Sequence, residues 1–218
     1  MVQHTDASLQ PYYAARASEY DAVYLKPERQ ADLREIEQWL PSHFVDKHVL
    51  EVACGTGYWT QFIAPVASGI TAIDATVETL EIATKRLRDD KVAFLVGDAY
   101  ALPQREEKFD AAFAGFWFSH VPKARQREFL SGLSSRLKSG AKVVLLDNRY
   151  VEGSSSAIVE QDGEGNTFQT RTLGNGTTHH VLKNFPSGVE LQALIGGFGE
   201  KAVFKTWPFF WSFEYVVT

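Results

Sequence analysis

The sequence predicts an α/β fold whose sheet is mostly parallel. From residue 49 to residue 147, short apolar runs alternate with amphipathic segments of helical periodicity. Such an alternation is typical of parallel strands joined by right-handed helical crossovers. The chain has 218 residues, of which 44% are hydrophobic, enough for one domain with a substantial core. We therefore expect a single domain over residues 1–218.

The first predicted strand ends in the turn Glu51-Val52-Ala53-Cys54-Gly55-Thr56-Gly57, which leads into a helix from Trp59. In α/β folds a turn at this place is a usual binding site for nucleotide-like ligands. A dinucleotide fingerprint starting at residue 53 requires glycine at positions 53, 55 and 58, but Ala53 and Tyr58 occupy two of them. No Gly-Lys-Ser or Gly-Lys-Thr follows, so the turn is not a triphosphate-binding loop either.

Two further predicted strands each end in an acid. The strand 69–74 ends in Asp74, 17 residues after Gly57, and residues 92–99 end in Asp98-Ala99. A carboxylate after the second strand can accept hydrogen bonds from both hydroxyls of a ribose. Asp74 can instead cap the helix predicted over residues 76–88. The position after the second strand favours the ribose contact.

Together these residues resemble the class I S-adenosylmethionine-dependent methyltransferases, whose first strand ends in an acid-x-G-x-G-x-G motif. Here the motif reads Glu51-x-Ala53-x-Gly55-x-Gly57, with alanine at its first glycine. The predicted strand 109–115 opens with the Phe-Asp pair of the family, and residues 137–140 (Leu-Lys-Ser-Gly) are similar to its Leu-Lys-Pro-Gly turn. The similarity runs from about residue 10 to the end and is closest to the small-molecule branch, with its quinone-biosynthesis and sugar N-methyltransferase types.

The resemblance implies a Rossmann-like, seven-stranded, mostly parallel sheet with helices on both faces, one antiparallel strand and a small β-hairpin insertion or lid. It implies S-adenosylmethionine as the cofactor and S-adenosylhomocysteine as its product. The methyl group of Ala53 is compatible with the turn if its φ is negative, and we expect it to tighten the turn without abolishing binding. The implied cofactor contacts are Tyr20, Tyr24, Glu51, Ala53, Gly55, Gly57, Asp74, Ala75, Asp98, Ala99, Gly115 and Phe116.

Two segments outside the alternating core are expected to cover the site. Residues 10–40 form an N-terminal helical lid, with one aromatic-rich helix over residues 11–24 and an amphipathic helix over residues 28–40. The alternative is that the tyrosines of the first helix only pack it onto the domain. Residues 148–186 contain strand-like stretches at 167–171 and 179–182, joined by a turn centred on Asn175-Gly176. We expect an inserted hairpin there that contributes to substrate specificity.

His120 is the candidate catalytic base, because it follows the fourth predicted strand and imidazole titrates near neutral pH. The alternative is that Ser119 and His120 cap or pack beside the helix that starts near Pro122. Aromatic residues near the predicted site suit a flat aromatic acceptor, or a cationic amine held by cation–π contacts. The candidate substrate-binding residues are Trp117, Arg149, Tyr150 and Trp211, of which Arg149 also suits a carboxylate or a phosphate.

Composition excludes several classes of partner. The net charge is −5 and no run of lysine and arginine stands out, so neither nucleic acid nor an anionic membrane is expected. The six histidines lack metal-ligand spacing, and a single cysteine and no long apolar stretch fit a cytoplasmic protein, monomeric or homodimeric. The leading hypothesis is methyl transfer to an O or N atom of a small aromatic or amine-containing molecule. The alternatives are a protein or RNA acceptor, and a non-catalytic cofactor-binding module.

Overall fold

A computed structural model describes residues 14, 16–174 and 176–218. Seven strands form one sheet in the order β3-β2-β1-β4-β5-β10-β9, in which β1 to β5 run parallel and β10 is antiparallel to both of its neighbours. This topology confirms the predicted fold, including its one antiparallel strand. The strands are β1 (His48–Val52), β2 (Gly69–Asp74), β3 (Val92–Val96), β4 (Phe109–Gly115), β5 (Leu137–Asn148), β9 (Gly199–Thr206) and β10 (Phe210–Val217).

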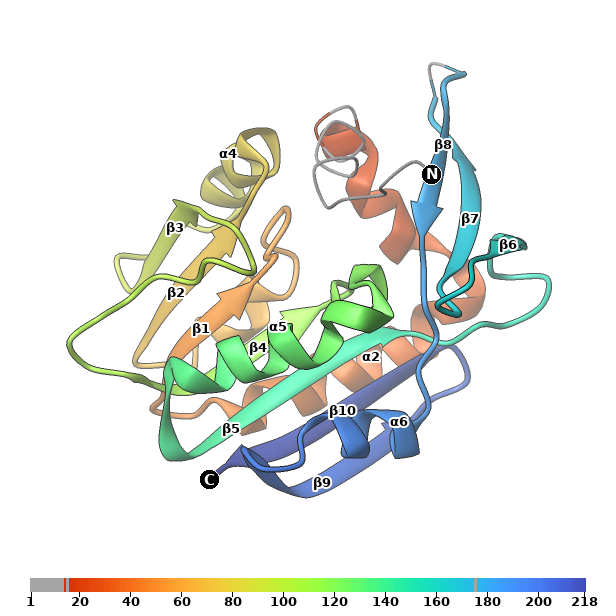
Figure 1. Ribbon diagram of the computed structural model, residues 1–218. Coiled ribbons are helices and arrows are strands. Elements are labelled where there is room, and N and C mark those ends of the chain that lie inside the picture. Colours follow the sequence, from red (N-terminus) through yellow and green to blue (C-terminus); the bar gives the residue numbers. More distant parts are fainter. Residues whose placement is uncertain (1–13, 15, 175) are drawn as a thin grey trace.

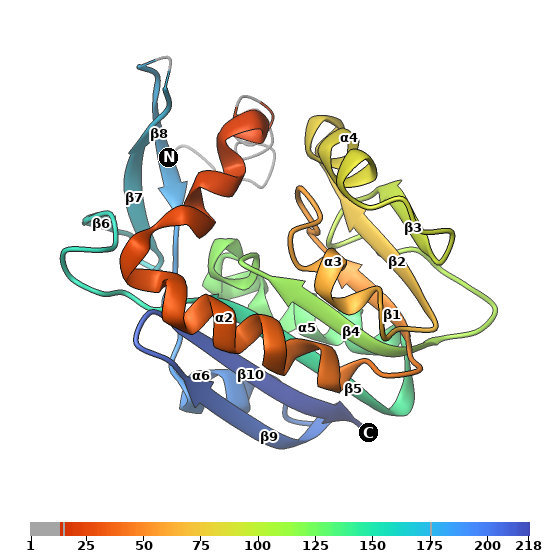
Figure 2. The same cartoon turned by 180° about the vertical axis from the view of Figure 1, so that it is seen from behind.

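Helices cover both faces of the sheet (Figures 1 and 2). One face carries α2 (Gln30–Trp39), α3 (Thr60–Ile63) and α4 (Val77–Arg86), and the other carries α5 (Lys123–Ser135) and α6 (Gly188–Leu194). The 3₁₀ turns in the described part of the chain include η2 (Ala17–Leu25), η3 (Pro27–Arg29), η4 (Leu40–His43) and η5 (Phe118–His120). Within the described residues, no helix is both long and apolar enough to cross a membrane.

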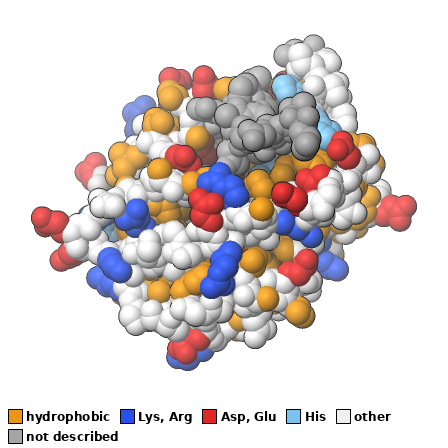
Figure 3. Space-filling model, viewed as in Figure 1, with side chains coloured by type: hydrophobic (Ala, Val, Ile, Leu, Met, Phe, Trp, Pro, Cys, Tyr) orange, Lys and Arg blue, Asp and Glu red, His pale blue; other side chains and the backbone are white. Residues whose placement is uncertain are grey.

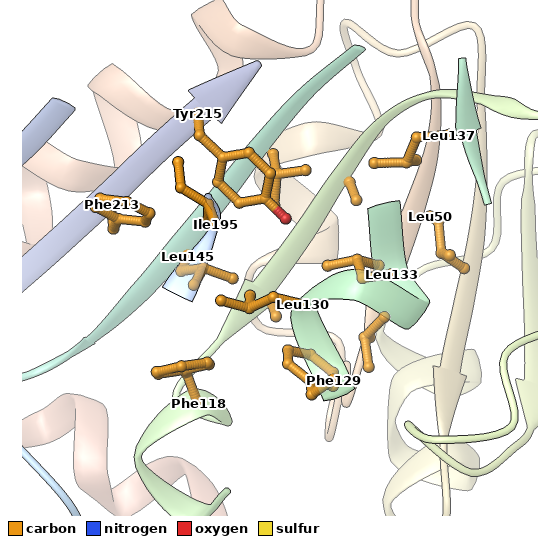
Figure 4. Packing of buried hydrophobic residues seen from close by; sticks show 14 of the residues in the cluster. Leu50, Phe118, Phe129, Leu130, Leu133, Leu137, Leu145, Ile195, Phe213 and Tyr215 are labelled. Atoms are coloured by element: carbon orange, nitrogen blue, oxygen red, sulfur yellow. The ribbon is translucent and has the colours of Figure 1, made fainter. Parts of the chain in front are cut away.

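The core on the α5 face explains why its helices form. Phe129, Leu130 and Leu133 recur at helical spacing and are at most 1% exposed, packed against side chains of the sheet (Figure 4). Burying side chains of this size contributes roughly 2 kcal/mol each. A capping box begins α6: the Ser187 side chain accepts the backbone N–H of Glu190, and the Glu190 side chain accepts the backbone N–H of Ser187.

The predicted insertion is a three-stranded antiparallel sheet. Strands β7 (Thr167–Thr172) and β8 (Thr178–Leu182) pair as the expected hairpin, and β6 (Ile158–Gln161) adds a third strand on the outer side of β7. Asn175, half of the predicted turn, lies outside the described residues, whereas Gly176 has φ +83°. In both views the small sheet stands beside η2, beyond the carboxyl ends of the parallel strands (Figures 1 and 2).

Two helices differ from the sequence-based prediction. The helix expected after the glycine turn ends at Ile63, because Pro65 has no N–H to continue the hydrogen-bond ladder. The N-terminal aromatic segment is described as η2 rather than as one long helix over residues 11–24, and residues 11–13 lie outside the described part. Lys26 adopts an extended conformation before Pro27, which separates η2 from η3.

Candidate functional site

The turn after β1 is built from left-handed backbone conformations. Gly55 and Gly57 have φ values of +55° and +72°, which favour glycine. A Cβ on Gly57 would lie 3.1 Å from the Cβ of Ala83, so glycine there also permits the close approach of α4. Ala53 has φ +55°, not the negative value expected from the sequence, because the chain must already reverse at the end of β1. The alanine therefore carries a left-handed conformation that costs about 1 kcal/mol.

Asp74, at the end of β2, faces this turn. Its Oδ2 accepts the N–H of Gly55 at 2.8 Å, and its Oδ1 accepts the N–H of Thr76 at 2.9 Å and the hydroxyl of Thr79 at 3.1 Å. Burial raises the pKa of Asp74, and these hydrogen bonds oppose the rise. Because each carboxylate oxygen has two lone pairs, these three hydrogen bonds leave one acceptor position, on Oδ2, for a ligand hydroxyl.

Glu51 lies beneath the turn rather than at its surface. Glu51 is 1% exposed, and its Oε2 has no hydrogen-bond partner among the described residues. Burial raises its pKa to about 8, so the side chain is largely protonated at neutral pH. Glu51 therefore holds a proton close to the predicted cofactor site.

The other predicted cofactor residues gather at the ends of neighbouring strands. Asp98 is exposed after β3, and its Oδ1 accepts the N–H of Tyr100 at 2.8 Å. At the end of β4, a Cβ on Gly115 would lie 2.9 Å from Trp59, so a larger residue does not fit there. Phe116 follows, buried and with φ +59°. Ala75 and Ala99, at the same edge of the sheet, are respectively exposed and half-buried.

The two predicted tyrosines of η2 lie in different environments. Tyr24 is buried and stacks on Tyr58 with ring centroids 3.5 Å apart, and it also stacks on Phe116. Tyr20 is half-buried, and its ring lies 3.7 Å from the position of a Cβ on Gly55. Burial raises the pKa of Tyr20, and the nearby Asp74 contributes to the rise. Tyr20 therefore borders the glycine turn, whereas Tyr24 packs in the aromatic cluster behind it.

A polar cluster fixes η2 over the turn. Asp21 accepts the hydroxyl hydrogen of Thr56 at 2.6 Å and forms an ion pair with Arg86 of α4. The Arg86 guanidinium also donates to the carbonyl of Thr56 at 2.7 Å. The N-terminal segment is thus bound to the turn by charged hydrogen bonds as well as by aromatic packing.

A cavity of about 420 Å³ opens on the other side of Tyr20. It lies between η2 and the small sheet, and Phe116 and His120, which follow β4, are among the residues that line it. The built position of a Cβ on Gly174 is 2.5 Å from the Glu19 carboxylate, so the β7–β8 turn and η2 are in close contact. A cavity of this size suits a small molecule.

His120 is buried at the base of this cavity. Its Nδ1 lies 2.7 Å from the carbonyl oxygen of Leu182, an acceptor, so Nδ1 carries the proton and donates it. Burial, together with the Lys183 and Arg171 charges, lowers the pKa of His120 well below its usual range. The imidazole is therefore neutral, with its lone pair at Nε2.

Beside His120 is a buried ion pair that the sequence does not predict. The Nζ of Lys183 lies 2.7 Å from Asp147 and also donates to the hydroxyl of Ser119, and all three residues are at most 3% exposed. Although burial alone would raise it, the Lys183 charge holds the pKa of Asp147 below its usual range. Asp147 ends the apolar run of β5, and a buried acid at a strand end is the signal that could have identified it.

The four predicted substrate residues are not among the described residues that line the cavity. Trp211 is buried against Phe118 in the core, and Trp117 packs on Phe129. Arg149 is exposed and donates to the carbonyl of Trp207, while Tyr150 packs edge-on against Phe185. The cavity is lined instead from η2, η3 and residues 148–185, which no local motif identifies. Within the described residues, no cluster of three or more His, Cys, Asp and Glu side chains is placed to hold a metal.

Comparison with known sequences places residues 49–140 in a family described as a methyltransferase domain. The demethylmenaquinone methyltransferase of Thermotoga maritima is 36% identical over 101 residues, which cover 45% of this chain and 42% of that protein. The malonyl-[acyl-carrier protein] O-methyltransferase of Priestia megaterium is 33% identical over 112 residues, which cover 48% and 40% of the two chains. The chain thus spans about two fifths of the length of these curated relatives.

Solved structures extend the similarity over nearly the whole chain. The DhpI–SAM–HEP complex has a TM-score of 0.81 and 29% identity, with 99% of each chain covered. The DhpI–SAH complex has a TM-score of 0.78 and 28% identity, with 97% of this chain and 96% of that one covered. With the strand order, the glycine turn and Asp74 in place, the chain belongs to the class I S-adenosylmethionine-dependent methyltransferases.

Proposed function

We propose that this protein transfers a methyl group from S-adenosylmethionine to an O or N atom of a small molecule bound in the cavity beside Tyr20. The observation that carries the proposal is the position of this cavity. It lies beyond the end of β4, bordered by Phe116 and His120, and Tyr20 lies between it and the glycine turn. The family fixes the cofactor, so the cavity is the natural place for the acceptor.

The residues of the chain have three tasks in this scheme. Asp74 and the turn hold the cofactor, which supplies an electrophilic methyl group. Tyr20 and Phe116 border the acceptor and keep water away from it, which favours an in-line displacement. Neutral His120 accepts a proton at Nε2 if the acceptor arrives protonated.

A small acceptor agrees better with the structure than a macromolecular one. The cavity has a volume of about 420 Å³, which suits a small molecule. On the face seen in Figure 3, basic and acidic side chains are interspersed and do not form a basic tract for RNA. Among small molecules, a flat aromatic acceptor fits the rings of Tyr20, Phe116 and Phe185.

Calorimetric titration with S-adenosylmethionine, followed by methyl-transfer assays on a panel of small molecules, tests this function. We expect one-site cofactor binding and turnover of at least one acceptor. Absence of cofactor binding contradicts the proposal. Binding without turnover on any acceptor favours the non-catalytic module.

The variant His120→Asn separates binding from catalysis in the same experiment. Asparagine places its Nδ2 near the position of the histidine Nδ1, so it retains the hydrogen bond to Leu182 and removes the basic Nε2. We expect unchanged cofactor affinity and a kcat lowered by roughly 100-fold. The variant His179→Asn, outside the described lining of the cavity, is the control. Turnover of His120→Asn within a few-fold of the wild type would remove the base from the mechanism and leave the methyl transfer.

A further inference from the structure

The cavity beside Tyr20 is strongly cationic. Five of the described residues that line it carry positive charge and one carries negative charge: Arg16, Lys26, Arg29, Arg171 and Lys183, against Glu19. Of the cations, Lys183 is neutralised by its ion pair with Asp147. The composition gives no hint of this excess, because the chain as a whole has a net charge of −5.

Arg29 is a buried cation whose hydrogen-bond partners are neutral. It is 4% exposed, and its guanidinium donates to Oδ1 of Asn148 at 2.7 Å and to Oγ of Ser154 at 3.1 and 3.0 Å. No carboxylate of the described residues lies within 4 Å of this guanidinium. Glu28 accepts the hydroxyl hydrogen of Ser154 from the solvent side, and Asp32 accepts the N–H of Phe209. A buried guanidinium without a direct counterion is costly, and Glu28 offsets this cost only through Ser154, so an anion bound in the cavity would stabilise Arg29 further.

Arg171 contributes to the cavity from β7. Its guanidinium donates to Oε1 of Gln169 at 3.1 Å, and it forms no ion pair with a described carboxylate. Lys26 is similar, since its Nζ donates to the carbonyl of Ser154. Burial lowers the pKa of Arg29, and the charge of Arg171 lowers it further. The two guanidinium groups therefore repel each other across the cavity.

We propose that the methyl acceptor is a small acid, and that Arg29 and Arg171 hold its carboxylate or phosphate group in this cavity. The inference rests on the proposed methyl transfer, and it names the substrate class. The planar guanidinium of Arg171 can bind such an oxyanion through parallel hydrogen bonds, and Arg29, held in place by Asn148 and Ser154, adds positive charge beside it. An acid bound there extends toward Phe116 and His120, where the methyl group is delivered. A cationic amine is disfavoured, because it would add to the repulsion.

The test is calorimetric titration of the protein with inorganic phosphate and, separately, with acetate, in low salt and with S-adenosylhomocysteine present or absent. The two probes distinguish a phosphate-like head group from a carboxylate. We expect one anion to bind at a single site, with affinity weakened at least 10-fold in Arg171→Gln and to a smaller extent in Arg171→Lys, which keeps the charge but not the planar fork. Lys201→Gln, which removes a cation whose side chain is 73% exposed on β9, is expected to bind like the wild type.

Thermal unfolding separates ligand binding from a structural role of Arg171. Without ligand, Arg171→Gln relieves the repulsion with Arg29, so its Tm is expected to equal or exceed that of the wild type. A clear fall in Tm would assign Arg171 a structural role and contradict the proposal. The proposal would be overturned if Arg171→Gln and the wild type bound the anion with equal affinity. It would also be overturned if neither phosphate nor acetate showed saturable binding.

Failure of the anion site and failure of the proposed methyl transfer give different results in these experiments. A protein that binds S-adenosylmethionine and turns over a neutral acceptor, but binds neither anion, overturns only the acidic substrate class. A protein that binds the anion at the Arg171 site, but does not bind S-adenosylmethionine, overturns the methyl transfer and leaves the anion site in place.

Discussion

The two ends of the site are built in different ways. The cofactor end is formed by the carboxyl ends of neighbouring parallel strands, so Gly55, Asp74 and Asp98 lie together because the sheet brings their strands together. The acceptor end is formed by η2, η3 and residues 148–185, which meet only in the folded protein. Arg29 and Asn148, for example, are hydrogen-bonded across 119 residues of sequence. Proteins with the same cofactor end can thus differ in acceptor by changing segments outside the strands.

The ends also differ in electrostatics. At the cofactor end, backbone N–H groups bind the carboxylate of Asp74, and Arg86 is paired with the acid Asp21. At the acceptor end the charged groups are mainly cations, and neutral oxygens bind Arg29. The contrast fits two ligands with opposite hydrogen-bonding needs. A ribose donates hydrogen bonds from its hydroxyls to a carboxylate, whereas an acid accepts hydrogen bonds from cations.

The largest expected effect comes from Asp74→Ala. Loss of the carboxylate removes its hydrogen bond to the ribose, and a charged hydrogen bond contributes about 1.5–3 kcal/mol, so cofactor affinity should fall roughly 100-fold. Anion binding at Arg171 should be unchanged, because the two ends are separate. Calorimetry with S-adenosylhomocysteine and with the bound anion measures both.

Glu81→Ala, on the exposed side of α4, is the control for the loss of an acid. If cofactor affinity in Asp74→Ala equals that of the wild type, the ribose contact lies elsewhere. If anion affinity falls together with cofactor affinity, the cofactor end and the acceptor end are energetically coupled and do not act as separate parts of the site.

What the sequence predicts follows the same division. The mostly parallel sheet, the glycine turn and Asp74 were predictable, because the strands have a strong apolar pattern and the residues at their ends resemble the motif of a known family. Arg29 and Lys183 were not, because a lone cation in a helical turn or after a strand usually faces solvent. The packing of Trp117 and Trp211 was not predictable for a related reason: composition indicates that rings are abundant, but not which side chains they pack against.

A smaller effect, on stability, is expected from Glu51→Gln at the cofactor end. The folded pKa of Glu51 is about 8 and its ordinary value is 4.5, so between these values the folded protein retains a proton that the unfolded chain has released. The stability contributed by Glu51 is therefore full below pH 4.5 and is lost as the pH rises toward 8. Glutamine does not titrate, so the Tm of the variant relative to the wild type should increase between pH 5 and pH 8, by roughly 5–10 °C.

Thermal unfolding of the ligand-free proteins at one-unit pH intervals measures this difference. Above pH 8 it should stop growing, because Glu51 is then ionised in both states. A Tm difference that does not vary with pH would mean that Glu51 is already ionised in the fold. Arg171→Gln, at the acceptor end, should not reproduce the pH dependence.

The smallest effect is expected from Ala53→Gly, which restores the glycine of the family motif. Alanine at φ +55° carries a left-handed strain of about 1–2 kcal/mol, and glycine relieves it at an entropic cost of about 0.5–1 kcal/mol in the unfolded chain. The net gain of under about 1 kcal/mol should raise the Tm by roughly 2 °C. Gly140, also left-handed at φ +83°, gives the reverse control, since Gly140→Ala should lower the Tm. A lower Tm for Ala53→Gly would show that the methyl group of Ala53 contributes packing that outweighs the strain, and that the cofactor end, too, depends on contacts which its motif does not describe.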